Sequence, residues 1–163
     1  MATIRNYQNK DLEAVTKIFN YYVENHTCTF QLKPFTLDEI RYKAEAIQKI
    51  YPFLVLQENN EVIGFAYGSR WRAKEAYDLS VETTIYLKPG LNGHGLGSQL
   101  YSQLIESLKT KGFHLLIGGL TLPNPASIRL HEKLGFEKVG EFKDAGKKFG
   151  QWHCVGFWQK IIS

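Results

Sequence analysis

The sequence predicts an α/β (α+β) domain in which a mixed, mostly antiparallel central sheet is flanked by helices. Two observations favour this fold class. Short strand-like segments recur along the chain, and segments with helical periodicity separate several of them. A near-continuous apolar segment follows the central helix, as expected for a buried strand that joins its neighbour through a right-handed parallel crossover. We expect a single domain spanning residues 1–163, because no repeat or linker divides these segments.

The first half of the chain predicts two helices and a three-stranded meander. Asp11 is placed to cap a helix, and Thr36 and Glu39 have the spacing of a capping box before a second helix to about Ile50. Pro52 ends that helix. The expected strands are residues 3–5, 53–57, 62–71 and 81–87, with a polar loop, WRAKEAYD, before the last of them.

The second half begins with a glycine loop at the start of a helix. A strand that leads into such a loop is typical of a phosphate site, because free backbone N–H groups and the helix dipole favour negative charge. The helix carries one apolar face and stops at Gly112. Asn124 and Pro125 start another helix that ends at Gly135. The remaining expected strands are residues 114–120, 136–141 and 152–161, the last two joined by a loop, DAGKKFG.

Composition and charge exclude several classes of protein. With 44% hydrophobic residues and a net charge of +4 the chain is globular and mildly basic, but its charges are interspersed, so we expect no nucleic-acid partner. We expect a cytoplasmic protein without a membrane partner, because neither a signal peptide nor a membrane-spanning run is visible. Cys28 and Cys154 lack CxxC spacing, and the histidines lack metal-ligand spacing, so we expect no metal.

The glycine loop fails the tests for two common nucleotide motifs. A P-loop requires a lysine after its last glycine, and Leu96 follows Gly95 here. A dinucleotide fingerprint would need Ser98 in place of its third glycine, and it would follow a β-meander rather than open a βαβ unit.

The loop resembles instead the acetyl-CoA loop of the Gcn5-related N-acetyltransferase (GNAT) family, with the pattern Q/R-x-x-G-x-G/A. The pattern lies on residues 92–97, and Asn92 stands where the family has Gln or Arg. A later family element matches Asn124, Ser127, His131 and the Gly-Phe at 135–136, with His131 where many members have Tyr. Five further segments, 51–55, 71–78, 81–87, 131–136 and 150–159, resemble the phosphinothricin acetyltransferase subfamily, so the resemblance covers the whole chain.

The resemblance implies acetyl-CoA as cosubstrate and a small amino-acid-like amine of the phosphinothricin, methionine sulfoximine or methionine sulfone type as acceptor. It implies direct attack within a ternary complex, and it makes a homodimer the expected assembly. The residues expected to bind acetyl-CoA lie on the strand, the glycine loop and the later helix: Ile85, Tyr86, Leu87, Gly93, His94, Gly95, Leu96, Gly97, Ser98, Asn124 and Ser127.

The chemistry requires a base, because a protonated amine cannot attack a thioester. Glu82 is the candidate, since a carboxylate on a half-buried strand beside the CoA loop can have a raised pKa. The alternative is a carboxylate on the polar face of an edge strand. His131 is a candidate acid for the leaving thiolate, although a histidine on an apolar helix face is more often a packed or surface residue. For Asn124, helix capping alone is a sufficient explanation, and one side chain can serve both roles.

The acceptor is expected to bind at the polar loop, where Arg72 and Lys74 can hold an acidic group. Phe30, Tyr77 and Trp152 are candidate walls beside Glu82, although for each aromatic taken alone an ordinary core position is the favoured interpretation. Two other functions stay open: an acetyltransferase for protein or peptide N-termini, and a catalytically silent CoA-binding sensor. A covalent acetyl-cysteine route is disfavoured, because neither cysteine has an obvious activating partner.

Overall fold

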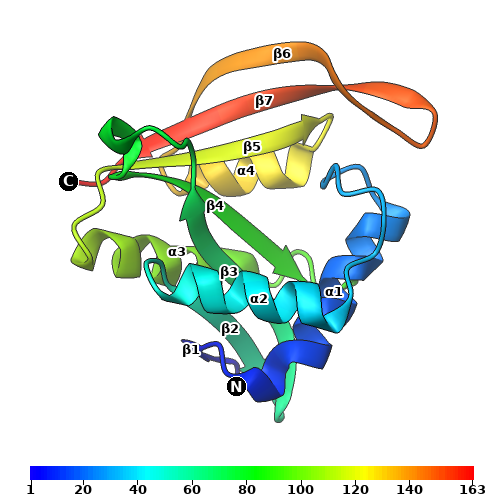
Figure 1. Cartoon of the computed structure of the whole chain (residues 1–163), viewed down its shortest axis with the longest axis vertical. Coiled ribbons are helices and arrows are strands. Elements are labelled where there is room, and N and C mark those ends of the chain that lie inside the picture. Colours follow the sequence, from blue (N-terminus) through cyan, green and yellow to red (C-terminus); the bar gives the residue numbers. More distant parts are fainter.

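The computed structural model describes residues 1–163 and is built on one seven-stranded sheet with the order β1-β2-β3-β4-β5-β7-β6 (Figure 1). Every neighbouring pair is antiparallel except β4 and β5. The mixed, mostly antiparallel sheet that the sequence predicts is therefore confirmed. The strands are β1 (Thr3–Asn6), β2 (Phe53–Glu58), β3 (Glu61–Arg70), β4 (Ser80–Leu87), β5 (Leu115–Leu122), β6 (Glu137–Lys148) and β7 (Gln151–Ile161).

Helices cover both faces of the sheet. Helices α1 and α2 pack together, α1 on β3 and β4 and α2 on β2 and β3, while α3 packs behind β2, β3 and β4 and α4 lies against β5 (Figure 1). Single 3₁₀ turns, η1 (Asn9–Asp11) and η2 (Glu75–Tyr77), precede α1 and β4. The helices are α1 (Leu12–Asn25), α2 (Leu37–Gln48), α3 (Leu96–Thr110) and α4 (Pro125–Lys133).

The parallel pair β4 and β5 separates soon after it forms. Residues 80–82 of β4 are paired with residues 115–117 of β5, and no pairing continues beyond Glu82 and Ile117. From there β4 stays with β3, while β5 continues along β7 to Leu122. Figure 1 shows the two strands diverging toward their carboxyl ends. The sheet therefore opens into a fork, and the edge of β4 that faces β5 is left unpaired.

Local signals in the sequence account for most element boundaries. The predicted capping box is present, because Thr36 accepts from the Glu39 N–H and the Glu39 carboxylate accepts from the Thr36 N–H. Asn59 and Asn60 adopt positive φ angles of 50° and 63°, which suits the tight turn between β2 and β3. The Asn124 side chain accepts from the Ser127 N–H at 3.2 Å and caps α4 as predicted.

Two local predictions were wrong. Residues 144–150 were expected to form a loop, but β6 continues to Lys148 and only Phe149 and Gly150 make the turn. A shift in register between Phe142 and Gly146, with Asp144 at a φ of 48°, lets the strand absorb the irregular residues. The end of this hairpin contacts the segment after α1, where Lys148 is 2% exposed and donates to the Thr29 carbonyl at 2.8 Å.

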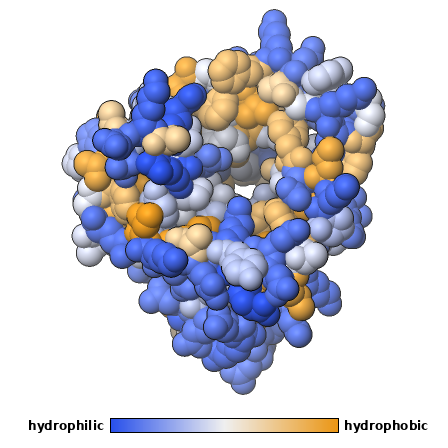
Figure 2. All heavy atoms as spheres, in the orientation of Figure 1, coloured by the Kyte–Doolittle hydropathy of each residue, from blue (hydrophilic) through white to orange (hydrophobic).

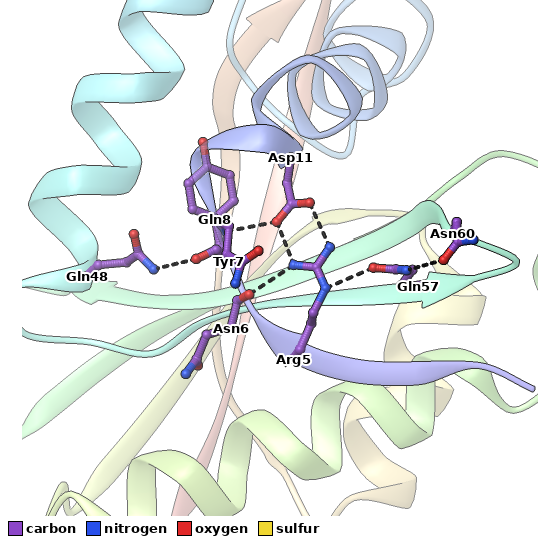
Figure 3. A network of polar contacts seen from close by, with 8 residues as sticks. All are labelled: Arg5, Asn6, Tyr7, Gln8, Asp11, Gln48, Gln57 and Asn60. Carbon is purple, nitrogen blue, oxygen red and sulfur yellow. Dashed lines mark hydrogen bonds and ion pairs between the residues drawn. The ribbon is translucent and has the colours of Figure 1, made fainter.

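Asp11 was also expected to cap α1 with its side chain. It occupies the N-cap position, but its carboxylate makes no capping bond. Instead it accepts two hydrogen bonds from Arg5, at 2.7 and 2.8 Å, and one from the Gln8 N–H at 2.8 Å (Figure 3). Arg5 also donates to Gln57 of β2, so the Arg5–Asp11 pair connects β1, η1 and β2.

We expect Asp11→Asn to lower the free energy of unfolding by about 2 kcal/mol, because a charge-assisted pair is lost and Arg5 is left without its partner. Although burial raises the pKa of the Asp11 carboxyl, bonds from Arg5 and Gln8 lower it more, so the pKa lies below its ordinary value. The stabilisation is thus complete above about pH 4, the ordinary pKa, and is lost as the pH falls through the lower folded pKa. Urea unfolding of both proteins across this range measures the difference.

The matched control is Asp78→Asn, which breaks a pair with Arg70 whose side chains are 53% and 58% exposed. Such exposed pairs contribute about 0–1 kcal/mol. Equal effects of the two substitutions at pH 7 would contradict a special role for Asp11.

Candidate active site

A cleft of about 810 Å³ lies in the fork between β4 and β5. Figure 2 shows this face hollowed near its middle, with apolar side chains gathered above the hollow. The cleft contains nine of the residues that the sequence predicted for the site. They come from the segment after α1, from β4, from α3 and from α4: Phe30, Glu82, Ile85, Tyr86, Leu87, Gly97, Asn124, Ser127 and His131.

The unpaired edge of β4 presents backbone groups to the cleft. Lys88 N–H donates to Ile63 at 2.7 Å, so the residues of β4 that bond to β3 are the even-numbered ones. The N–H and C=O groups of Ile85 and Leu87 consequently face the gap, whereas those of Tyr86 face β3. The Tyr22 hydroxyl of α1 donates to the Leu87 carbonyl at 2.6 Å. An extended ligand can therefore pair with Ile85 and Leu87 as an added strand.

Glu82 lies where β4 and β5 separate, half-buried on the sheet face that α2 covers. Burial raises the pKa of its carboxyl, and the charge of Lys43 on α2 partly offsets the effect. The carboxylate has no hydrogen-bonding or ion-pairing partner in the chain. An unpaired carboxylate with a raised pKa inside a cleft has the properties of a general base.

His131 is held by partners on both ring nitrogens. Its Nδ1 lies 2.8 Å from the Ser127 carbonyl, an acceptor, so Nδ1 carries the proton. Its Nε2 lies 3.0 Å from the Tyr101 hydroxyl, which is 2.5 Å from the Thr83 hydroxyl. The ring is 3% exposed, and its burial lowers the pKa of the imidazole. The neutral ring is thus part of a satisfied network, and its role as an acid stays a prediction that requires protonation at Nε2.

The glycine loop lines a second hollow of about 290 Å³ beside the first. Gly95 is the N-cap of α3 in the left-handed conformation, at a φ of 75°, and it has no side chain to cap the first N–H groups of the helix. Gly93, Gly95, Gly97 and Ser98 line this hollow, whereas His94 and Leu96 do not. Arg129 and Lys133, one turn apart on α4, complete its wall. The hollow therefore combines free amides with two cationic side chains, which is a suitable environment for phosphate.

Four residues predicted to bind the acceptor lie outside the cleft of this chain. Arg72 and Lys74 are exposed, and the Arg72 guanidinium stacks 4.7 Å from the Trp71 ring, which Tyr77 contacts edge-on. Trp152 is 59% exposed on β7. Only Phe30, packed against Gly146, and Glu82 reach the cleft. The predicted homodimer, which is the assembly that could bring such exposed residues to a site, stays a prediction.

Sequence reasoning missed several residues of the two hollows. Tyr22 and Lys43 come from α1 and α2, far along the chain from β4, and no motif marked them. The i, i+4 spacing of Arg129 and Lys133 showed that they share a helix face, but not that this face meets the glycine loop. Cys28 also lines the cleft, and burial raises the pKa of its thiol to about 11.

Two further observations concern metals and membranes. No group of three or more His, Cys, Asp or Glu side chains is arranged to hold a metal ion. No helix combines the length and apolar character that crossing a membrane would require.

Comparison with known proteins adds independent information. Residues 4–153 match the family model described as an acetyltransferase (GNAT) domain. The chain is 42% identical to the phosphinothricin N-acetyltransferase of Streptomyces viridochromogenes, over 92% of this chain and 82% of that protein. It is 35% identical to the L-methionine sulfoximine/L-methionine sulfone acetyltransferase of Salmonella typhimurium, over 96% and 92% of the two chains.

A solved structure agrees with these sequence matches. The phosphinothricin acetyltransferase of Sinorhizobium meliloti, determined in complex with acetyl-CoA, superposes with a TM-score of 0.96. The two chains are 35% identical, with 99% of this chain and 89% of that chain covered. The resemblance found in the sequence is confirmed.

The packing of His131 on β5 generates a prediction for Gly118. A Cβ at this position would lie 2.6 Å from Nε2 of His131, so the ring would have to leave its place against Tyr101. We expect Gly118→Ala to lower the free energy of unfolding by about 1–3 kcal/mol, as overpacking of a close contact does. The control is Gly140→Ala, where an added Cβ meets nothing within 4 Å. Urea midpoints that fall equally for both variants would refute this account of the contact.

Proposed function

The chain belongs to the Gcn5-related N-acetyltransferase (GNAT) family, and on this premise we propose that it transfers the acetyl group of acetyl-CoA to the α-amino group of a small amino-acid-like substrate. The acceptors named for its relatives, phosphinothricin, methionine sulfoximine and methionine sulfone, define the proposed class. One observation carries the proposal: an unpaired carboxylate, Glu82, lies at the fork of the sheet beside the free edge of β4.

Acetyl-CoA would extend from the second hollow into the cleft. The amides that begin α3 and the side chains of Arg129 and Lys133 would hold its phosphates. The two cations would compensate for Asn92, which stands where the family has Gln or Arg. The pantetheine arm would then pair with the backbone of Ile85 and Leu87, with Asn124 and Ser127 of α4 on the other side. This geometry would bring the thioester to the region of Glu82.

Glu82 would act as the general base. It would accept a proton from the α-ammonium group of the acceptor, so that the nitrogen lone pair can attack the thioester carbonyl. A free N–H group of the unpaired β4 edge near Glu82 would stabilise the oxyanion that forms on the carbonyl oxygen. As the intermediate collapses the carbon–sulfur bond breaks and CoA leaves as a thiolate. The nitrogen releases its second proton to water, and Glu82 afterwards returns the first proton to solvent. The products are an N-acetyl amino acid and CoA.

Direct attack is favoured over an acetyl-cysteine intermediate. Cys28 is the cysteine that lines the cleft, but a thiol whose pKa is raised to about 11 is almost fully protonated at neutral pH. Thiols react with thioesters as thiolates, so this side chain is a poor nucleophile here. A ternary complex of enzyme, acetyl-CoA and amine therefore agrees best with the side chains present.

The substrate class is tested by an assay of CoA release from acetyl-CoA. We expect release with phosphinothricin, methionine sulfoximine or methionine sulfone and little with a peptide that has a free N-terminus, because the proposed acceptor is a free amino acid. Turnover of the peptide without turnover of any amino acid would overturn the proposal in favour of an N-terminal acetyltransferase. Binding of acetyl-CoA without turnover of any amine would favour a sensor.

The base is tested by Glu82→Gln. We expect kcat to fall by about 10²- to 10⁴-fold while the Kd for acetyl-CoA, measured by calorimetry, is unchanged, because a general base acts only in the chemical step. In the wild type, activity should fall on the acid side as the pH passes through the raised pKa of Glu82. Glu106→Gln, an exposed position on α3, is the control. Unchanged kcat in Glu82→Gln on a verified substrate would exclude Glu82 as the base.

A further inference from the structure

Lys43 is a cation inside the cleft that the predicted site did not include. It lies on α2, is half-buried, and lines the cleft with Tyr67, Ser69 and Glu82. Ser69 is paired directly with Glu82 across β3 and β4, so these side chains lie on the same face of the sheet. The Lys43 Nζ lies 5.6 Å from the centre of the Tyr67 ring.

The ammonium group of Lys43 has no direct anionic partner. The five ion pairs of the chain involve other residues, and Lys43 donates no side-chain hydrogen bond. Glu82 is near enough to interact through charge but does not form an ion pair with it. A desolvated ammonium gains most from an anion that brings its own hydrogen-bond acceptors. The cleft therefore contains an ammonium group, that of Lys43, to which an anionic ligand can bind.

The other cations considered for the acceptor do not share this position. Arg72 and Lys74 are exposed outside the cleft, and Arg72 is stacked on Trp71. Arg129 and Lys133 line the second hollow beside the glycine loop. Lys148 is buried with its Nζ bonded to the Thr29 carbonyl. Of these lysines and arginines, only Lys43 lies in the cleft with Glu82 and without a hydrogen-bonded partner.

We propose that Lys43 is a specificity-determining residue, whose ammonium group binds an anionic group of the acceptor and so orients its amine toward Glu82. This inference rests on the proposed function. The anion is a carboxylate or a phosphinate, and two sources supply it: the α-carboxylate that every free amino acid carries, and the acidic side chain of substrates such as phosphinothricin. A carboxylate bound at Lys43 would hold the amine near Glu82, because the two groups of an α-amino acid are joined through one carbon.

Lys43 also acts on the base. Burial raises the pKa of Glu82, and the positive charge of Lys43 lowers it. The titratable groups that face Glu82 in the cleft are Lys43 from α2 and Tyr67 from β3, and burial raises the pKa of Tyr67 so that it stays neutral. Removal of the Lys43 charge should therefore raise the pKa of Glu82 and move the acid side of the activity profile to higher pH. Lys43→Arg keeps the charge and should keep this profile, so the comparison separates the charge of Lys43 from its packing.

The test compares Lys43→Met and Lys43→Arg with the wild type on three acceptors: phosphinothricin, methionine sulfone and methionine sulfone amide, which has no anionic group. On the plateau of the pH profile we expect Lys43→Met to lower kcat/KM for the acids by about 10- to 100-fold, mainly through KM. The amide should change little, and Lys43→Arg should restore much of the loss. Lys49→Met, an exposed position just after α2, is the control.

The pattern across acceptors identifies the anion. A loss for both acids assigns the α-carboxylate, and a loss for phosphinothricin alone assigns its side-chain acid. Equal losses for the acids and the amide would overturn the proposal, as would no loss for any acceptor or equal losses in the Met and Arg variants. If the wild type does not turn over the amide, the proposal is tested by comparing the Lys43→Met and Lys43→Arg variants on the two acids.

Failure of this inference can be told from failure of the proposed function. Wild-type turnover of phosphinothricin and methionine sulfone, with no loss for either acid in Lys43→Met, would reject the role of Lys43 alone. No wild-type turnover of any of the three acceptors would reject the proposed function, and the inference would fall with it.

Discussion

The short parallel contact between β4 and β5 is the constraint on which the site depends. Three residues of each strand pair, and the strands then separate because each follows a different antiparallel neighbour, β3 or β7. A longer parallel ladder would satisfy the edge of β4 and leave no cleft. The separation leaves the cleft-facing backbone groups of Ile85 and the Leu87 N–H without strand partners, while the Leu87 carbonyl accepts from Tyr22. Unpaired backbone groups of this kind are usually satisfied by a ligand or water. The binding edge is thus a consequence of topology.

The two faces of β4 contact different helices. Val81 and Thr83 point toward α3, where Val81 is fully buried and Thr83 contacts Tyr101. Glu82, Thr84 and Tyr86 point toward α1 and α2, where the Tyr86 ring packs against Phe19. Residues 82–87, from both faces, line the cleft. The alternation seen in the sequence fixes this division, because neighbouring residues of a strand face opposite sides. One strand can therefore hold the core together while its other face presents a carboxylate to a ligand.

The elements of the fold were predicted from interactions between residues close together in the sequence. The predictions failed where contacts between distant residues decide the structure. Capping at Thr36 and Asn124, the β2–β3 turn and the glycine loop depend on neighbouring residues, so the sequence revealed them. The prediction that the Asp11 side chain caps α1 was wrong, because a carboxylate before a helix can either cap it or form an ion pair. The nearby Arg5 on β1 forms the ion pair. Glu82 was found through its strand and the family resemblance. Lys43 could not be found in this way, because its place beside Glu82 depends on how α2 crosses the sheet.

The polar groups at the fork differ in how many hydrogen bonds they make within the chain. His131 has a partner on each nitrogen, and Tyr101 links it to Thr83, so this network holds α4 and α3 to the sheet. Glu82 and Lys43 lie in the same cleft without hydrogen-bonded partners, although burial makes such groups costly. A fully bonded group gains nothing from a ligand, whereas an unbonded one gains the most. The two unbonded charges are therefore where an amine and an anion joined by one carbon would be stabilised together.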